Sequence, residues 1–96
     1  MLTSKQRSYL RGLANKIEPI FHVGKNSVTP ELTKTIDEAL AARELIKISV
    51  LENCSLEPAE VSELIGGRTR SEIVQVIGRK IVLYRQSKKP AIKLPS

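Results

Sequence analysis

Residues 73–84 read IVQVIGRKIVLY, two runs of mostly β-branched residues separated by a glycine and two basic residues. The pattern predicts a β-hairpin with strands at 73–77 and 81–84 and the turn at 78–80. Strands separated by helices favour right-handed parallel crossovers, whereas the two strands of a hairpin must be antiparallel. This segment therefore decides the fold, because it adds an antiparallel pair to strands that are otherwise separated by helices.

Two further strands are predicted before this hairpin. The run from Leu45 to Leu51 alternates apolar residues with Lys47 and Ser49, as in a strand with one buried face. Residues 20–23 form a short apolar run that is consistent with a buried strand. The resulting order, α-β-α-β-α-β-β, predicts an α/β (α+β) fold in which helices pack on a small mixed four-stranded sheet.

Helices are predicted between these strands. The first begins at a capping box formed by Thr3 and Gln6 and ends at Pro19. The second begins at Thr29, with a proline at its first position, and has an apolar stripe that extends to residue 40. For the third we expect Ser55 as the cap and an end or fraying at residues 66–67, which are both glycine.

Composition limits the class of protein. The 96 residues are 41% apolar, so we expect one domain over residues 1–96, with an irregular basic tail at 87–96. The apolar runs are too short to span a bilayer and the first residues lack the apolar core of a signal peptide, so we expect a cytoplasmic protein with no membrane partner. One cysteine, Cys54, and one histidine, His22, predict no disulfide, no metal site and no cofactor.

The net charge of +6 is unevenly distributed. Residues 1–16 carry four basic and no acidic side chains, residues 17–78 carry six basic and ten acidic, and residues 79–96 carry six basic and no acidic. A positive face for a polyanion is one interpretation, and a terminal tail that is merely solvated is the other. The first interpretation requires the fold to bring the two basic ends together.

A second short segment, VGKNSVTP at residues 23–30, joins the predicted strand at 20–23 to the second helix. A loop that ends at a helix N-terminus exposes unpaired backbone N–H groups and the positive end of the helix dipole, which suit a phosphate oxygen. Gly24 lets the backbone approach closely, and Lys25 adds charge. An ordinary structural turn is the alternative interpretation, and Thr29 and Glu31 already use part of the site.

Three linked motifs carry a resemblance to one known family. They are the 23–29 loop with its following helix, ARELIK at residues 42–47, and QVIGRKIVLYR at residues 75–85. In this order, and over almost the whole chain, they resemble the bacterial YhbY family, the stand-alone form of the plant CRM RNA-binding domain. The resemblance implies a fold similar to the C-terminal domain of bacterial translation initiation factor three, RNA binding, and association with precursors of the large ribosomal subunit.

In that family the glycine loop is usually Gly-x-x-Gly, similar in idea to the KH-domain loop that clamps a nucleic-acid backbone. Carried over, the motif maps to Gly24, Lys25, Asn26 and Ser27, so that serine replaces the last glycine. Its Cβ is expected to restrict both a positive φ and close phosphate approach, while its hydroxyl can donate to a phosphate instead. We therefore expect weakened or reshaped binding at this loop.

We predict a non-catalytic RNA-binding protein whose partner is rRNA in large-subunit precursors and which assists ribosome assembly; the assembly role is implied by the resemblance alone. Aromatic residues are scarce, so recognition is expected to depend on phosphates and RNA shape. The loop and a single positive face that includes it are predicted to bind RNA through Gly24, Lys25, Asn26, Ser27, Lys5, Arg7, Arg11, Arg79, Lys80 and Arg85.

Two other functional classes are open. A protein-interaction adaptor would bind acidic surfaces of ribosomal or other proteins, and binding to protein-free RNA discriminates against it. An RNA-modifying enzyme would need a nucleophile with a base or two convergent carboxylates, but His22 and Cys54 lie in separate segments and Asp37 and Glu38 diverge on a helix. We expect no small-molecule substrate and a monomer.

Overall fold

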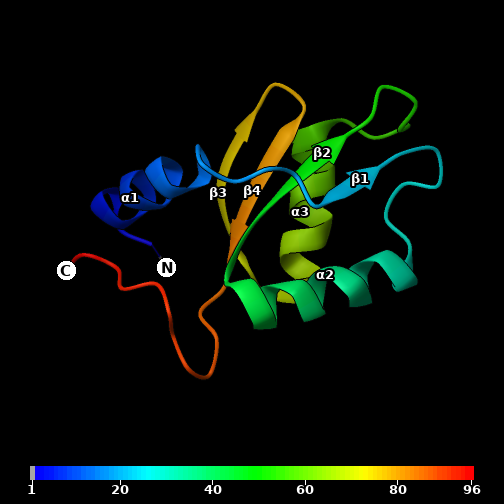
Figure 1. The fold of residues 1–96 in the computed structure, drawn as a ribbon. Coiled ribbons are helices and arrows are strands. Elements are labelled where there is room, and N and C mark those ends of the chain that lie inside the picture. The colour runs from blue at the N-terminus through cyan, green and yellow to red at the C-terminus, as the bar shows by residue number, and fades with distance from the viewer. Residues whose placement is uncertain (1) are drawn as a thin grey trace.

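A computed structural model describes residues 2–96 as one sheet with helices on both of its faces (Figure 1). Along the chain the elements are α1 (Ser4–Ala14), β1 (Phe21–Val23), α2 (Pro30–Arg43), β2 (Leu45–Val50), α3 (Pro58–Thr69), β3 (Glu72–Ile77) and β4 (Lys80–Tyr84). The predicted order of helices and strands is confirmed. In residues 2–96 no helix has both the length and the apolar character needed to cross a membrane.

The last strand lies inside the sheet. The strands are ordered β1-β2-β4-β3, with β1 parallel to β2 and β4 antiparallel to both of its neighbours. Consequently β1, β2 and β3 all run in one direction and β4 runs in the other. The prediction of a mixed four-stranded sheet in an α+β fold is confirmed.

Alternation along β2 and β4 divides the apolar residues between two cores. Ile46, Ile48 and Val50 pack toward α2 and α3, together with Ile81 and Leu83 of β4. Leu10 and Ala14 of α1 pack on the opposite face of the sheet, against Leu45, Val74, Val82 and Tyr84. The residues that pack on α1 lie toward one end of that face, and His22, Ser49 and Lys80 at its other end are not part of this core.

Local sequence explains where the helices begin. Thr3 and Gln6 form the predicted capping box of α1, and the Thr29 hydroxyl caps α2 by accepting the Leu32 N–H at 3.1 Å. The expected cap of α3 at Ser55 is wrong. Proline occupies the first position of α3, so the residue before it, Glu57, is the cap.

The expected end of α3 at the two glycines is also wrong, because the helix continues to Thr69 and closes at Arg70 in a left-handed conformation, with φ of 55°. A Cβ on Gly66 would lie 3.3 Å from Ile73 Cγ1. Glycine thus lets α3 approach β3 closely, and the Thr69 hydroxyl donates to the Ile65 carbonyl at 2.7 Å within the last turn. The tertiary contact outweighs the low helix propensity of glycine.

The end of α1, the strand that follows it and the C-terminal tail also differ from expectation. Helix α1 ends at Ala14, before Pro19, and the strand at 21–23 has an exposed residue at its centre. Residues 85–96 form no helix or strand, yet Ile92 and Leu94 pack into the α1 core. The Gln6 Nε2 group donates to the Pro95 carbonyl at 3.1 Å, so the two ends of the chain lie together (Figure 1).

Candidate nucleic-acid interface

Three connecting segments meet at one end of the sheet: residues 24–29 after β1, residues 51–57 after β2, and the β3–β4 turn at 78–79. We call them the loop end. Leu51 joins all three, because its N–H donates to the Val23 carbonyl at 2.8 Å and its carbonyl accepts from Arg79 Nη2 at 2.9 Å. A Cβ on Gly24 would lie 3.3 Å from Leu51 Cδ1. The glycine is therefore what allows this close approach.

The glycine loop is a tight turn with its lysine at the tip. The Ser27 N–H donates to the Gly24 carbonyl at 2.9 Å, which closes the turn and leaves Lys25 and Asn26 exposed. Within residues 2–96, the backbone N–H groups of Lys25 and Asn26 have no protein acceptor. The tip thus combines backbone donors with a positive charge, as a phosphate contact requires.

Ser27 adopts the conformation that a glycine would favour. Its φ is 53°, so the Cβ has not prevented a left-handed backbone. Its hydroxyl lies 3.2 Å from Ser55 Oγ and 3.6 Å from Cys54 Sγ. The serine hydroxyl therefore contacts the segment after β2. Its donation to a phosphate stays a prediction, because a hydroxyl that accepts these contacts keeps its own proton to donate.

The N-terminus of α2 offers less than the sequence suggested. The Thr29 hydroxyl accepts the Leu32 N–H, and the Thr29 carbonyl accepts the Thr33 N–H. Pro30 has no N–H to offer. Among the first helical residues only Glu31 keeps an N–H without such a partner, and its own carboxylate opposes a second anion there. The donors for a phosphate are accordingly at the loop tip.

Arg79 and Lys80 lie at the same end as the glycine loop. The Arg79 side chain folds onto the end of β2, with Nε donating to the Val50 carbonyl at 2.8 Å and Nη2 to the Leu51 carbonyl. Its remaining guanidinium N–H groups are left for a ligand. Lys80 is exposed, and its Nζ donates to Ser49 Oγ at 3.2 Å.

Two residues on the sheet face that packs against α1, His22 and Lys47, were not predicted as site residues. His22 pairs in register with Ser49, which pairs with Lys80, so all three point to the face that α1 covers at its other end. Lys47, two residues before Ser49, lies on this face as well. The alternation along β2 could have predicted the face on which Lys47 lies. The face on which His22 lies depends on the pairing of β1 with β2, which the sequence does not show.

Helix α1 contributes on the same side of the sheet. Lys5 and Arg11 are exposed on this helix. Arg7 has a structural role, because its Nη1 donates to the carbonyls of Ile73 and Val74, the latter at 3.2 Å, beside the bulge in β3. Lys5 and Arg11 therefore present their charges to solvent, while Arg7 is held against the sheet.

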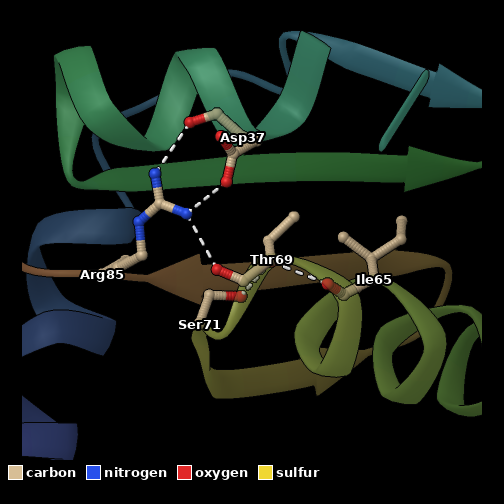
Figure 2. Close-up of polar contacts among 5 residues, drawn as sticks. All are labelled: Asp37, Ile65, Thr69, Ser71 and Arg85. Atoms are coloured by element: carbon tan, nitrogen blue, oxygen red, sulfur yellow. Dashed lines mark hydrogen bonds and ion pairs between the residues drawn. The ribbon is translucent and has the colours of Figure 1, made fainter. Parts of the chain in front are cut away.

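Arg85 lies at the opposite end of β4 from Lys80. Figure 2 shows its guanidinium between α2 and the end of α3. Its Nη1 lies 2.5 Å from Asp37 Oδ1 and donates to the Thr69 carbonyl at 2.8 Å. Its Nη2 donates to the Asp37 carbonyl at 2.9 Å. This side chain thus joins the end of β4 to α2 and to the end of α3, at the end of the sheet opposite the loop end.

The basic residues fall into two groups and not into the single predicted face: Lys5 and Arg11 lie on α1, near the chain termini, whereas Lys25, Arg79 and Lys80 lie at or next to the loop end. The chain termini do come together, but the glycine loop lies on the far side of the molecule from them (Figure 1). The loop end holds Gly24–Ser27 and Arg79, and Lys80, His22 and Lys47 lie on the adjoining strands. In residues 2–96 no group of three or more His, Cys, Asp or Glu side chains is placed to hold a metal ion.

Residues 2–85 match the family model of the CRS1/YhbY (CRM) domain. The chain belongs to this family. This CRM protein is 50% identical over 96 residues to the probable RNA-binding protein YqeI of Bacillus subtilis, covering 99% of this chain and all of that protein. It is 35% identical over 94 residues to an RNA-binding protein of Haemophilus influenzae, covering 98% of this chain and 95% of the other.

A solved structure has the same fold. The solution structure of the Staphylococcus aureus protein SAV1595 superposes with a TM-score of 0.83 at 50% sequence identity, covering 99% of this chain and all of that one. The resemblance to the YhbY family is confirmed by these matches. The CRM match contains every helix and strand and ends at Arg85, so the tail that follows lies beyond it.

Proposed function

We propose that this CRM protein binds RNA without catalysing a reaction, and that its RNA is the rRNA of large-ribosomal-subunit precursors, whose assembly it assists. Relatives that are named RNA-binding proteins and match nearly the whole chain support the RNA partner. The ribosomal partner is supported by the family resemblance. The single observation that carries the proposal is the lysine-tipped glycine loop, which lies at the same end of the sheet as Arg79 and Lys80.

The loop end is suited to a phosphate backbone. A phosphate oxygen at the tip would accept from the N–H groups of Lys25 and Asn26, while the ammonium group of Lys25 neutralises its charge. Lys47 and Lys80 extend the positive surface along the strands, and the imidazole of His22 lies on the same face as a further hydrogen-bonding group. None of the residues named at the loop end is aromatic, so we expect contacts to phosphates and to the shape of the RNA rather than stacking on bases.

Replacing Lys25 with alanine tests the loop. Each phosphate contact contributes a salt slope of about 0.7 to 0.9, so the variant should lower the slope of log affinity against log salt by about one, with RNAs of different sequence. Lys34→Ala, which removes an exposed lysine from α2, is the matched control. An unchanged slope in a folded Lys25→Ala protein would remove Lys25 from the site.

Two further measurements separate the remaining alternatives. Binding to protein-free RNA is expected here, whereas an adaptor for acidic protein surfaces should show little. Cross-linking in cell extract, followed by sequencing of the attached RNA, should return fragments of large-subunit rRNA precursors. Fragments scattered over unrelated RNAs would contradict the assembly role and leave RNA binding intact.

A further inference from the structure

The carboxylate of Glu44 is buried, with 2% of the residue exposed, and it holds the C-terminal tail. One of its oxygens accepts the N–H groups of Ala91 at 2.7 Å and Ile92 at 2.9 Å. The other accepts the Ser87 N–H at 3.0 Å and the Ser87 hydroxyl at 3.3 Å. Among residues 2–96 no basic side chain forms an ion pair with Glu44, so the tail itself supplies the donors that stabilise the charge.

These donors decide the ionisation of the carboxyl group. Burial raises the pKa of Glu44, but the backbone N–H groups of Ser87, Ile92 and Ala91 and the Ser87 hydroxyl together lower the pKa below its ordinary value. Glu44 also has a φ of 67°, in the region that favours glycine. The hydrogen bonds from the tail therefore stabilise a buried, ionised carboxylate at a residue whose backbone conformation is unfavourable.

The bonds to Glu44 turn part of the tail into a closed loop. Ser87 and Ala91, at its two ends, are both held by the same carboxylate. We call residues 87–91 the tail loop. Lys88 and Lys89 are exposed at its tip, and within residues 2–96 neither makes a hydrogen bond or an ion pair. Beyond it, Ile92 and Leu94 pack into the α1 core, so the basic tail is not merely a solvated one.

The tail loop and the glycine loop have a similar structure but lie on opposite sides of the molecule. Both are short turns closed at their base by hydrogen bonds, with lysine at the tip. In Figure 1 the tail, drawn orange to red, runs along the opposite side of the molecule from the loop between β1 and α2. The longest dimension of the protein is 39 Å. One RNA that reached both loops would therefore have to extend across much of the molecule.

The charge around the tail loop favours a polyanion. Residues 86–96 contain three basic side chains, Lys88, Lys89 and Lys93, and no acidic one. Because Glu44 has already ordered the backbone, binding loses less conformational entropy than it would with a disordered tail. A second contact on the same RNA would gain further from the effective concentration set by the first.

We propose that the tail loop is a second site for RNA phosphates, separate from the loop end and set in place by Glu44, so that the protein holds one RNA at two distant points. This inference rests on the proposed RNA-binding function.

The test uses the full chain and two RNAs. A short single strand of about 6 nucleotides fits one site, whereas a hairpin duplex of about 16 base pairs, the span of a double-stranded RNA-binding domain, can reach further. The double variant Lys88→Ala/Lys89→Ala should bind the duplex roughly 14- to 30-fold more weakly at about 0.15 M salt, with a slope lower by about 1.4 to 1.8. Its affinity for the short strand should be unchanged.

The control removes the same charge elsewhere. Lys34→Ala/Arg68→Ala deletes two exposed basic residues from α2 and α3, and it should bind the duplex like the wild type. An equal loss in both double variants would show an effect of net charge and overturn the inference. Circular dichroism and urea unfolding establish that each variant is folded.

The failure of this inference is distinguishable from failure of the proposed function. Wild-type affinity of Lys88→Ala/Lys89→Ala for the duplex, together with weak binding by Lys25→Ala, would overturn the second site and leave the first. If Lys88→Ala/Lys89→Ala lost binding to an acidic protein but kept its affinity for RNA, the tail loop would be a site for a protein partner. That result would also overturn the second RNA site. If the wild type bound neither RNA, both proposals would fall.

Discussion

Replacing Glu44 with alanine should release the tail while leaving the sheet folded. A hydrogen bond to a charged group contributes about 1.5 to 3 kcal/mol, and three backbone N–H groups bind this carboxylate. At the lower limit the three bonds total about 4.5 kcal/mol. Part of this is offset because the freed amides regain water and the tail regains conformational entropy. We therefore expect docking of the tail to weaken by about 2 to 3 kcal/mol.

Hydrogen exchange reports this change locally. A loss of about 2 to 3 kcal/mol corresponds to exchange roughly 30- to 140-fold faster at the amides of Ala91 and Ile92. Amides in β2 and β4 should keep their wild-type protection, and trypsin should cleave after Lys88 sooner. Glu38→Ala, which removes an exposed glutamate from α2, is the matched control. Wild-type exchange at Ala91 and Ile92 in the Glu44→Ala protein would refute the role given to this carboxylate.

Three further predictions concern stability measured by urea unfolding. The folded-state pKa of Glu44 lies below its ordinary value of 4.5, so the contribution of its carboxylate to stability is complete above pH 4.5 and is lost as the pH falls through the folded-state pKa. Glu44→Gln should therefore lose less stability in acid than the wild type. Ser27→Gly should stabilise the fold by roughly 0.5 to 1 kcal/mol by relieving the positive φ, and a lowered midpoint would contradict this. Gly67→Ala should stabilise α3 by about 1 kcal/mol because open space surrounds it, whereas Gly66→Ala should gain nothing, so equal effects would refute the close approach of α3 to β3.

Much of the fold was predictable because its signals are local. The hairpin at 73–84, the capping box at Thr3 and the proline that begins α2 each depend on residues within a few positions of one another. The end of α3 was not predictable in this way. Gly66 continues the helix because it lies against Ile73, and that contact exists only in the folded chain.

In the candidate site too, local features could be predicted and contacts between distant segments could not. The turn that places Lys25 at an exposed tip could be predicted from its glycine and its neighbours. Arg85, by contrast, looked like one more positive charge in the sequence, and only the fold shows that Asp37 and the Thr69 carbonyl occupy its guanidinium group (Figure 2). Charge can be counted from a sequence, but the partners of each charge depend on distant segments.

The position of β4 has a consequence for biosynthesis. It pairs with both β2 and β3, so neither of those strands has its central neighbour until residues 80–84 have been made. A nascent chain that stops short of β4 would expose two unpaired strand edges and the apolar side chains that β4 covers, which promotes aggregation. Folding of this sheet is therefore expected to be completed late, after residues 80–84 have left the ribosome.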